Sequence, residues 1–188
     1  MSSRYKGKPV VPPLDQRKLQ ELALRYVGKY ATTRAKLCSY LARKLWERGW
    51  DGDRQPDLEA LANRFAELGY IDDASFALAQ SRSLSSQGYG KRKVTEKLRL
   101  AGVEECDGEA ANEHADKEAV AAALRFAERR HIGPFASGPT DRFQRERWIA
   151  AMVRAGHGFT LARIIAEFTP GAAVDPDDLK DRAGMFED

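Results

Sequence analysis

The chain has 188 residues, which is enough for one hydrophobic core or a short row of linked subdomains. Charged residues make up 31% of it and aromatic residues 9%, and the net charge is +3. No apolar run approaches the roughly 20 residues that a membrane-spanning helix needs, and the first residues lack the apolar stretch of a secretory signal. We therefore expect a soluble cytoplasmic protein that does not contact a membrane.

The cysteine content agrees with a reducing compartment. Cys38 and Cys106 lie far apart and fit no metal-ligand spacing. Cys38 stands among apolar residues and is expected to be a buried thiol. Alanine, leucine, arginine and glutamate dominate the composition, whereas valine and isoleucine are few, and this balance favours helix over strand.

In chain order, residues 1–13 are basic, end in two prolines and are expected to form a flexible basic arm. Apolar residues then recur at helical spacing, and Asp15, Thr33, Asp141 and Thr160 stand where helix caps are expected. The expected helices are residues 15–30, 34–48, 56–68, 73–84, 91–100, 104–115, 117–130, 142–155 and 161–169. Residues 132–139 are expected to be an irregular loop, and residues 170–188 an acidic flexible tail.

Three of these helices end alike, which indicates an internal repeat. The closing glycines are Gly49, Gly102 and Gly156, which are 53 and 54 residues apart. An apolar residue stands four and eight positions before each glycine, close to whole helical turns. These residues are Leu45, Leu98 and Met152 at four positions, and Leu41, Val94 and Trp148 at eight. The sequence predicts an all-α fold of three tandem three-helix repeats, at residues 14–71, 72–116 and 117–169, in an elongated curved array of either hand.

Charge follows the same period. Residues 1–50 carry 12 basic and 3 acidic side chains, residues 81–100 carry 6 and 1, and residues 119–170 carry 8 and 4, whereas the intervening stretches are acidic. One interpretation is a set of solvated helix faces with ion pairs between neighbours. The other is a positive stripe that binds a polyanion or a protein assembly wound on one.

A set of residues in the middle of the chain forms a more specific pattern. It consists of Leu61, Phe65, Leu68-Gly69-Tyr70-Ile71-Asp72-Asp73, Phe76-Ala77, Arg82, Gly88-Tyr89-Gly90, Val94, Leu98 and Gly102-Val103. This pattern resembles the core signature of the RecX recombination regulators, and flanking matches at residues 33–49 and 154–164 extend the resemblance over about residues 20–168. Ala155 and His157 depart from the family pattern in the third repeat.

The resemblance implies a non-enzymatic regulator that binds the RecA recombinase filament on single-stranded DNA and restrains strand exchange and ATP hydrolysis. It leaves single- or double-stranded DNA open as a direct partner, and we expect a monomer without cofactor or metal. The candidate residues for binding recombinase or DNA are Lys91, Arg92, Lys93, Lys97, Arg43, Lys44, Arg48 and Arg82. The competing interpretation is that these side chains only solvate helix surfaces.

Two other functional classes compete with this interpretation. Short helices joined by glycine turns also fit a stand-alone DNA-binding protein, such as a transcription regulator. An enzyme is disfavoured because the chain has no phosphate-binding Gly-Lys-Ser/Thr run and no zinc-ligand spacing. Asp72-Asp73 fits a helix cap better than a catalytic pair, and surface or capping roles are expected for His114, His131 and His157.

Overall fold

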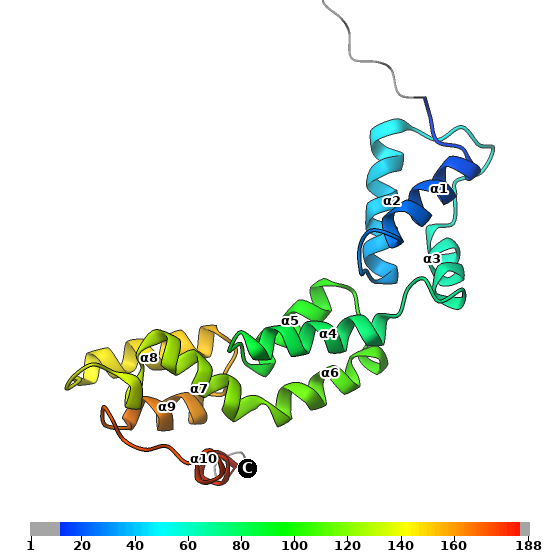
Figure 1. Cartoon of the computed structure of the whole chain (residues 1–188). Helices are drawn as coiled ribbons and strands as arrows, with labels where there is room; N and C mark the ends of the chain where they lie inside the picture. Colours follow the sequence, from blue (N-terminus) through cyan, green and yellow to red (C-terminus); the bar gives the residue numbers. More distant parts are fainter. Residues whose placement is uncertain (1–11, 185–188) are drawn as a thin grey trace, which may run out of the picture. The chain divides into compact units, whose positions relative to one another are not determined.

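The computed structural model describes residues 12–184 and is helical over that range, with ten α-helices, one 3₁₀ helix and no β-strand. The helices are α1 (Gln16–Val27), α2 (Arg34–Arg48), α3 (Leu58–Glu67), α4 (Asp73–Ser86), α5 (Lys91–Leu100), α6 (Glu105–Lys117), α7 (Ala119–Arg130), η1 (Gly133–Phe135), α8 (Arg142–Arg154), α9 (Phe159–Glu167) and α10 (Pro176–Gly184) (Figure 1). The expected all-α class is confirmed. Of the expected basic arm, residues 1–11 lie outside the described residues.

Helix starts follow local capping signals. Asp15, Thr33, Asp57 and Asp141 precede α1, α2, α3 and α8, and the side chain of each accepts a hydrogen bond from a backbone N–H in the first turn. Such a bond satisfies one of the amide groups that a helix leaves without an internal partner. The positions of these helices are therefore set by residues adjacent to them in sequence.

The chain divides into two compact units, of which the first ends at Asp72 and the second begins at Asp73. The first unit contains α1, α2 and α3 around one hydrophobic cluster, whose buried residues are Leu14, Leu19, Ala23, Leu37, Leu41, Leu61, Ala62, Phe65 and Ile71. Tyr26 on α1 stacks on Tyr40 on α2 with ring centroids 4.2 Å apart. Ahead of α1, the N–H of Leu14 donates to the carbonyl of Gly49, and the N–H of Asp51 donates to the carbonyl of Leu14.

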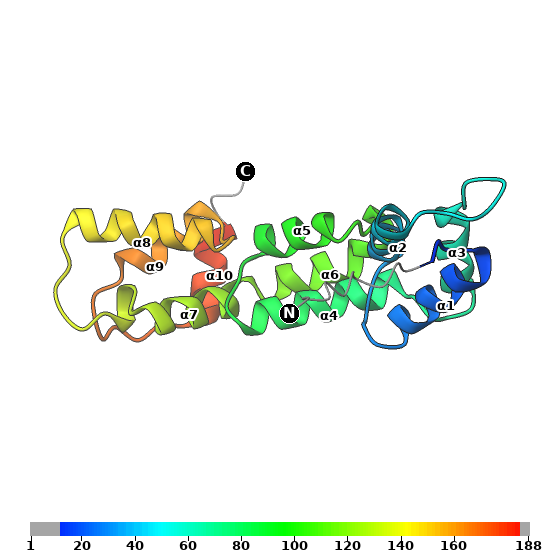
Figure 2. The ribbon, with the colours of Figure 1, turned by 90° about the horizontal axis from the view of Figure 1, so that it is seen from above.

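The second unit contains α4 to α10 and two hydrophobic clusters. In the smaller cluster, Ala77 of α4, Val94 and Leu98 of α5, and Ala111 and Ala115 of α6 pack together. The alanines let α4 and α6 approach closely, and these two helices run side by side in both views of the ribbon (Figures 1 and 2).

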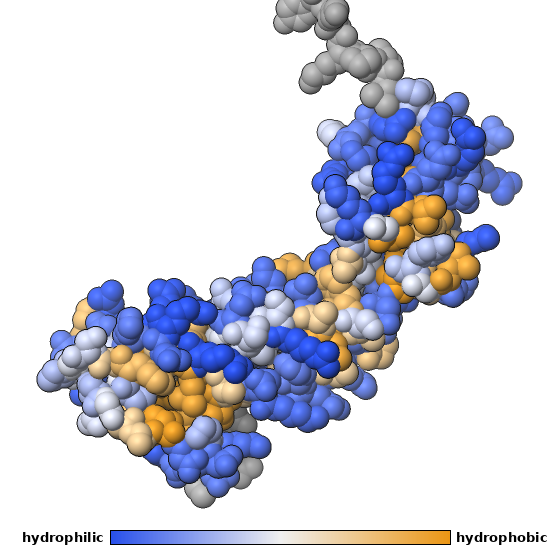
Figure 3. All heavy atoms as spheres, in the orientation of Figure 1, coloured by the Kyte–Doolittle hydropathy of each residue, from blue (hydrophilic) through white to orange (hydrophobic). Residues whose placement is uncertain are grey.

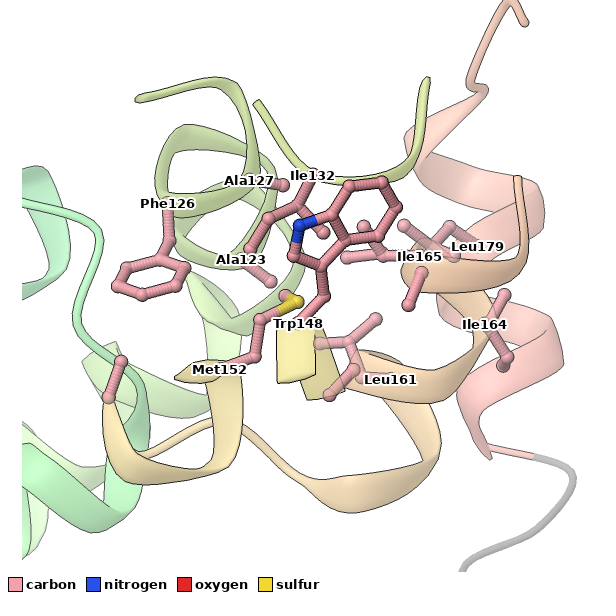
Figure 4. Packing of buried hydrophobic residues seen from close by; sticks show 13 residues of the cluster. Ala123, Phe126, Ala127, Ile132, Trp148, Met152, Leu161, Ile164, Ile165 and Leu179 are labelled. Atoms are coloured by element: carbon pink, nitrogen blue, oxygen red, sulfur yellow. The ribbon is translucent and has the colours of Figure 1, made fainter. Parts of the chain in front are cut away.

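The larger cluster of the second unit joins α7, α8, α9 and α10. The Trp148 side chain of α8 lies among Ala127, Ile132 and Ile165, with Met152 one turn further along α8 (Figure 4). Leu179 of α10 is fully buried at the other side of Ile165. Burying such side chains stabilises a fold by roughly 1.5–3 kcal/mol each, so α10 is fixed to this unit.

Two turns of the second unit pack backbone against backbone. The N–H of Gly90 donates to the carbonyl of Ala155 at 3.0 Å, and the N–H of Arg92 donates to the carbonyl of Gly156 at 3.2 Å. Gly156 has a φ of +96°, and a Cβ atom there would stand 2.5 Å from the backbone nitrogen of Lys93. The contact between residues 88–90 and 155–158 therefore requires glycine at Gly156 and links α4–α5 to α8–α9.

The structure corrects several local expectations. The first helix ends at Val27 with Gly28 as its C-cap, because the N–H of Lys29 bonds three residues back, to Tyr26, and no longer four. Tyr30, beyond this end, is half-exposed. We expected Trp46 beside the buried edge of the second helix, but its side chain is 87% exposed. Gly158 caps α9, so Thr160 lies inside that helix and is not its cap.

Two segments expected to be irregular contain helices. Residues 132–139 include η1, and Ile132, Gly133 and Pro134 are buried against α9. The expected flexible tail contains α10, which the buried Leu179 holds in place. In both segments a few apolar residues pack on a surface that forms only when the chain folds.

Within residues 12–184, none of the helices combines the length and the apolar character that crossing a bilayer requires.

Replacing Gly156 with alanine tests the contact between the two turns. The new Cβ would collide with α5 and would hold an L-residue at a positive φ, so we expect Gly156→Ala to lower the free energy of unfolding by about 2 kcal/mol or more. Denaturant unfolding followed by circular dichroism measures this change. Gly138→Ala is the matched control, because no atom lies within 4 Å of a Cβ there. Equal stability of the two variants would contradict the proposed role of the contact.

Candidate functional site

The most basic helix, α5, presents one apolar side to the protein. Val94 and Leu98 are buried in the smaller cluster of the second unit, and Gly90 before α5 is fixed by its bond to Ala155. The positions between Val94 and Leu98 are therefore turned away from the core. Lys91, Arg92, Thr95, Glu96, Lys97 and Arg99 are all exposed.

Acidic neighbours neutralise part of this helix. Lys91 Nζ lies 2.7 Å from Asp116 Oδ2 of α6, and Lys93 Nζ lies 2.8 Å from Glu96 Oε2. The hydrogen bond from Lys93 lowers the pKa of the Glu96 carboxyl. Arg92 and Lys97, by contrast, form no ion pair with any residue in the range 12–184. Arg99 is exposed on α5 and likewise forms no ion pair with a described residue, so the unpaired positive charge of α5 lies on three side chains. Arg82 lies exposed on α4.

The candidate residues of the first unit lie on α2. Lys44 Nζ lies 2.6 Å from Glu47 Oε2, and Arg43 Nε lies 3.8 Å from Glu47 Oε1. The hydrogen bond from Lys44 lowers the pKa of the Glu47 carboxyl. Both cations also stand within 6 Å of the Tyr40 ring centroid. Arg48 donates from Nε and Nη2 to the carbonyl of Pro12. All three candidate side chains of α2 therefore have a local partner.

A cavity of about 580 Å³ in the second unit is lined by arginine and aromatic side chains. We call it the arginine cavity. Arg129 and Arg130 come from the last turn of α7 and Arg154 from the last turn of α8. The other lining residues are Gln87, Tyr89, Phe126, Ala151 and Ala155, so no carboxylate of a described residue lines the cavity. Three guanidinium groups in one hollow can bind phosphate or carboxylate.

A second cavity of about 980 Å³ borders α5 and has mixed charge. Lys91, Arg92 and Lys180 line it together with Asp116 and Asp181. The paired turns at residues 88–90 and 155–158 contribute to the walls of both cavities. Figure 3 shows mainly hydrophilic side chains over the visible face of α4–α6, and apolar side chains gathered beside α9.

His157 lies between these turns and is buried, contrary to the expected surface or capping role. Its side chain is 2% exposed, and its Nε2 lies 3.1 Å from the carbonyl oxygen of Gly88. Because a carbonyl only accepts, Nε2 carries the proton and donates to Gly88. Burial disfavours the imidazolium ion and lowers the pKa of His157 to about 4, although the bond to Gly88 opposes this effect. His131 does cap α7, in the left-handed conformation.

The start of α6 brings together three groups that could bind a metal ion. Glu104, Cys106 and Asp107 place ligand atoms within 4.8 Å of one another. Acidic residues in a first turn also interact favourably with the positive end of the helix. We assign this group to the stabilisation of α6.

Cys38 is half-buried. Burial, and to a lesser extent the negative charge of Glu59, raises the pKa of its thiol, so the inert thiol form dominates.

Sequence reasoning placed the candidate residues on helix surfaces but did not find the arginine cavity. Arg129 and Arg130 are 24 residues or more from Arg154 in sequence, and their side chains meet only after α7 and α8 pack. A local signal existed, because each arginine lies in the final turn of a helix. That signal alone indicates a favourable interaction with the negative helix end, not a shared site.

Three curated proteins named "Regulatory protein RecX" resemble the chain along most of its length. The protein from Myxococcus xanthus is 30% identical over 163 residues, which cover 81% of this chain and 86% of the relative. The protein from Halorhodospira halophila is 35% identical over 162 residues, covering 85% and 90%, and that from Thermobifida fusca is 30% identical over 160 residues, covering 83% and 81%. No family model matches the chain.

The buried His157 predicts how stability depends on pH. The pKa of this side chain is about 4 in the folded protein and about 6.5 in the unfolded chain, so the unfolded chain binds a proton first as the pH falls. The neutral imidazole of His157 therefore contributes fully to the free energy of unfolding above pH 6.5. As the pH falls to about 4, the protein loses this contribution, about 3 kcal/mol in total.

The variant His157→Gln isolates this effect, because glutamine can still donate to Gly88 but does not titrate in this range. Denaturant unfolding of both proteins between pH 7 and pH 4 should show that the wild type loses more stability than the variant, by about 3 kcal/mol. Parallel stability curves would show that the imidazole is not a buried neutral group.

Proposed function

The chain belongs to the RecX family, and from this membership we propose that it regulates the RecA recombinase. It binds the recombinase filament on single-stranded DNA and inhibits strand exchange and ATP hydrolysis, and so modulates recombination and DNA repair. The observation that carries this proposal is the similarity to regulatory proteins over more than four-fifths of the chain. The protein acts by binding and not by catalysis.

The charge distribution of the second unit supports binding to an anionic or DNA-containing assembly. Arg92 and Lys97 project from α5 without an ion pair among the described residues, and the arginine cavity lies in the same unit. Lys91 and Lys93 contribute less, because Asp116 and Glu96 already balance them. Exposed ion pairs are weak, at about 0–1 kcal/mol, so a binding partner can displace these acids.

The tandem arrangement belongs to the same proposal. We propose three-helix repeats at residues 14–71, 72–116 and 117–169. Its support is that α1–α3, α4–α6 and α7–α9 each contribute most of the buried residues of a different hydrophobic cluster, although α10 adds Leu179 to the third. Several weakly binding repeats on one chain would bind an assembled filament more tightly than a free recombinase subunit, because the later contacts become intramolecular.

A stand-alone DNA-binding protein, such as a transcription regulator, is the second candidate. The observation that favours it is the arginine cavity, which could bind phosphate without a recombinase. Sequence-dependent binding to bare duplex DNA distinguishes this candidate from the first.

The test of the proposed function follows ATP hydrolysis by RecA on single-stranded DNA while the pure protein is added. We expect hydrolysis to fall at a modest excess of the protein over the recombinase. Reversing two of the unpaired cations of α5 in Arg92→Glu/Lys97→Glu should raise the concentration needed for half-inhibition by about tenfold, a change of about 1.4 kcal/mol in binding free energy.

Two further proteins complete this test. Arg163→Glu is the matched control, since Arg163 on α9 already faces Glu167, and it should inhibit like the wild type. Lys91→Glu/Lys93→Glu should have the smaller effect of the two double variants. Failure of the wild-type protein to inhibit at any concentration would refute the proposed function, and equal inhibition by all variants would remove α5 from the contact.

A further inference from the structure

The arginine cavity has the size and lining of a ligand site. Its volume of about 580 Å³ falls within the range of small-molecule pockets, roughly 300–1,000 Å³. Phe126 is 4% exposed and forms a fixed apolar wall, and Tyr89 packs against the larger cluster of the second unit. Positive charge and aromatic surface therefore meet in one hollow of suitable size.

Two of the three arginines of the cavity are held in place by groups other than carboxylates. Arg129 Nη1 donates to the carbonyl of Gln87. The guanidinium carbons of Arg129 and Arg130 lie 5.6 and 5.8 Å from the centroid of the Phe126 ring, a distance at which a cation is attracted to an aromatic face. These contacts orient the guanidinium groups and leave their charge uncompensated.

On α7 and α8, Arg125 and Arg142 have acidic partners, whereas Arg145 and Arg147 form no ion pair with a described residue. Arg125 Nη2 lies 2.6 Å from Glu118, and Arg142 Nε lies 2.8 Å from Glu146. Arg130 and Arg154 form no ion pair with a described residue. Their position in last helical turns accounts for each arginine separately, but it does not account for three of them converging on one cavity without an acid.

We propose that the arginine cavity binds a phosphorylated nucleoside, either free or as one nucleotide of a single strand. Arg130 and Arg154 bind the phosphate, for which the planar guanidinium offers two parallel donors. Tyr89 stacks on the base, as aromatic side chains do in proteins that bind single strands. An acidic peptide would use the arginines equally well but would leave the aromatic wall without a role, and this difference favours a nucleotide.

This inference adds a ligand site to the proposed function, and its test needs no recombinase. The full chain is titrated into a fluorescein-labelled oligothymidylate, and binding is followed by fluorescence anisotropy at several salt concentrations. We expect Arg130→Ala/Arg154→Ala to weaken binding by about tenfold or more. The slope of log affinity against log salt should fall by about 0.7 for each phosphate that the variant no longer neutralises.

Arg145→Ala is the matched control. Arg145 is an exposed arginine of α8 outside the cavity, so its removal should change neither the affinity beyond about twofold nor the salt slope. If the double variant binds as tightly as Arg145→Ala, the cavity is not the site and the inference fails.

The contribution of the base is tested in two independent ways. Tyr89→Phe should bind like the wild type, whereas Tyr89→Leu should bind about tenfold more weakly. Because the leucine variant could unfold, an abasic strand of equal length is titrated into the wild-type protein as well, and it should bind about tenfold more weakly than oligothymidylate. Equal binding of both strands would overturn the stacking role of Tyr89.

Competition distinguishes the sources of the ligand. Displacement of the labelled strand by thymidine monophosphate indicates a site for free nucleotides, and displacement by unlabelled strand alone indicates a site for the polymer; either result supports the inference. Displacement by polyglutamate at the same concentration of charges would overturn it in favour of an acidic peptide. A chain that binds the strand but does not inhibit RecA would refute the proposed function and leave this inference intact.

Discussion

The second unit depends on one close contact between two turns of the backbone. Gly90 and Arg92 donate hydrogen bonds to the carbonyls of Ala155 and Gly156, and glycine at the crossing allows the chains to approach without a side chain between them. His157 adds a third bond, to Gly88. This contact fixes where α5 begins, and therefore which side of α5 exposes its cations to solvent. It also sets the walls of both cavities.

Charge in this protein is distributed more selectively than the sequence indicates. Lys91 and Lys93 belong to the most basic stretch of the chain, yet each contacts a carboxylate. Cations without an acidic partner among the described residues include Arg92, Lys97 and Arg99 on α5 and the arginines of the arginine cavity. The basic stretch of the sequence therefore overstates the charge that α5 has left unpaired, because two of its lysines already contact acids.

Family membership rests on the sequence as a whole and not on a single site. The chain matches RecX regulatory proteins over most of its length, and the arginine cavity places cations, which attract anions, beside aromatic side chains. The buried imidazole of His157 is neutral near pH 7, because burial holds its pKa near 4, and it serves the packing of the two turns.

The sequence by itself determined the helical class, most helix positions and the membership of a family. Helix caps such as Asp15 and Thr33 and the apolar spacing act within a few residues, so they can be recognised without the fold. Tertiary structure alone decided the exposure of Trp46, the burial of His157 and Leu179, and the arginine cavity. Each of these depends on a surface that distant parts of the chain build together, and no local pattern encodes such a surface. The same reason explains the candidate site, where the sequence identified the basic helix but only packing showed which of its charges are already paired.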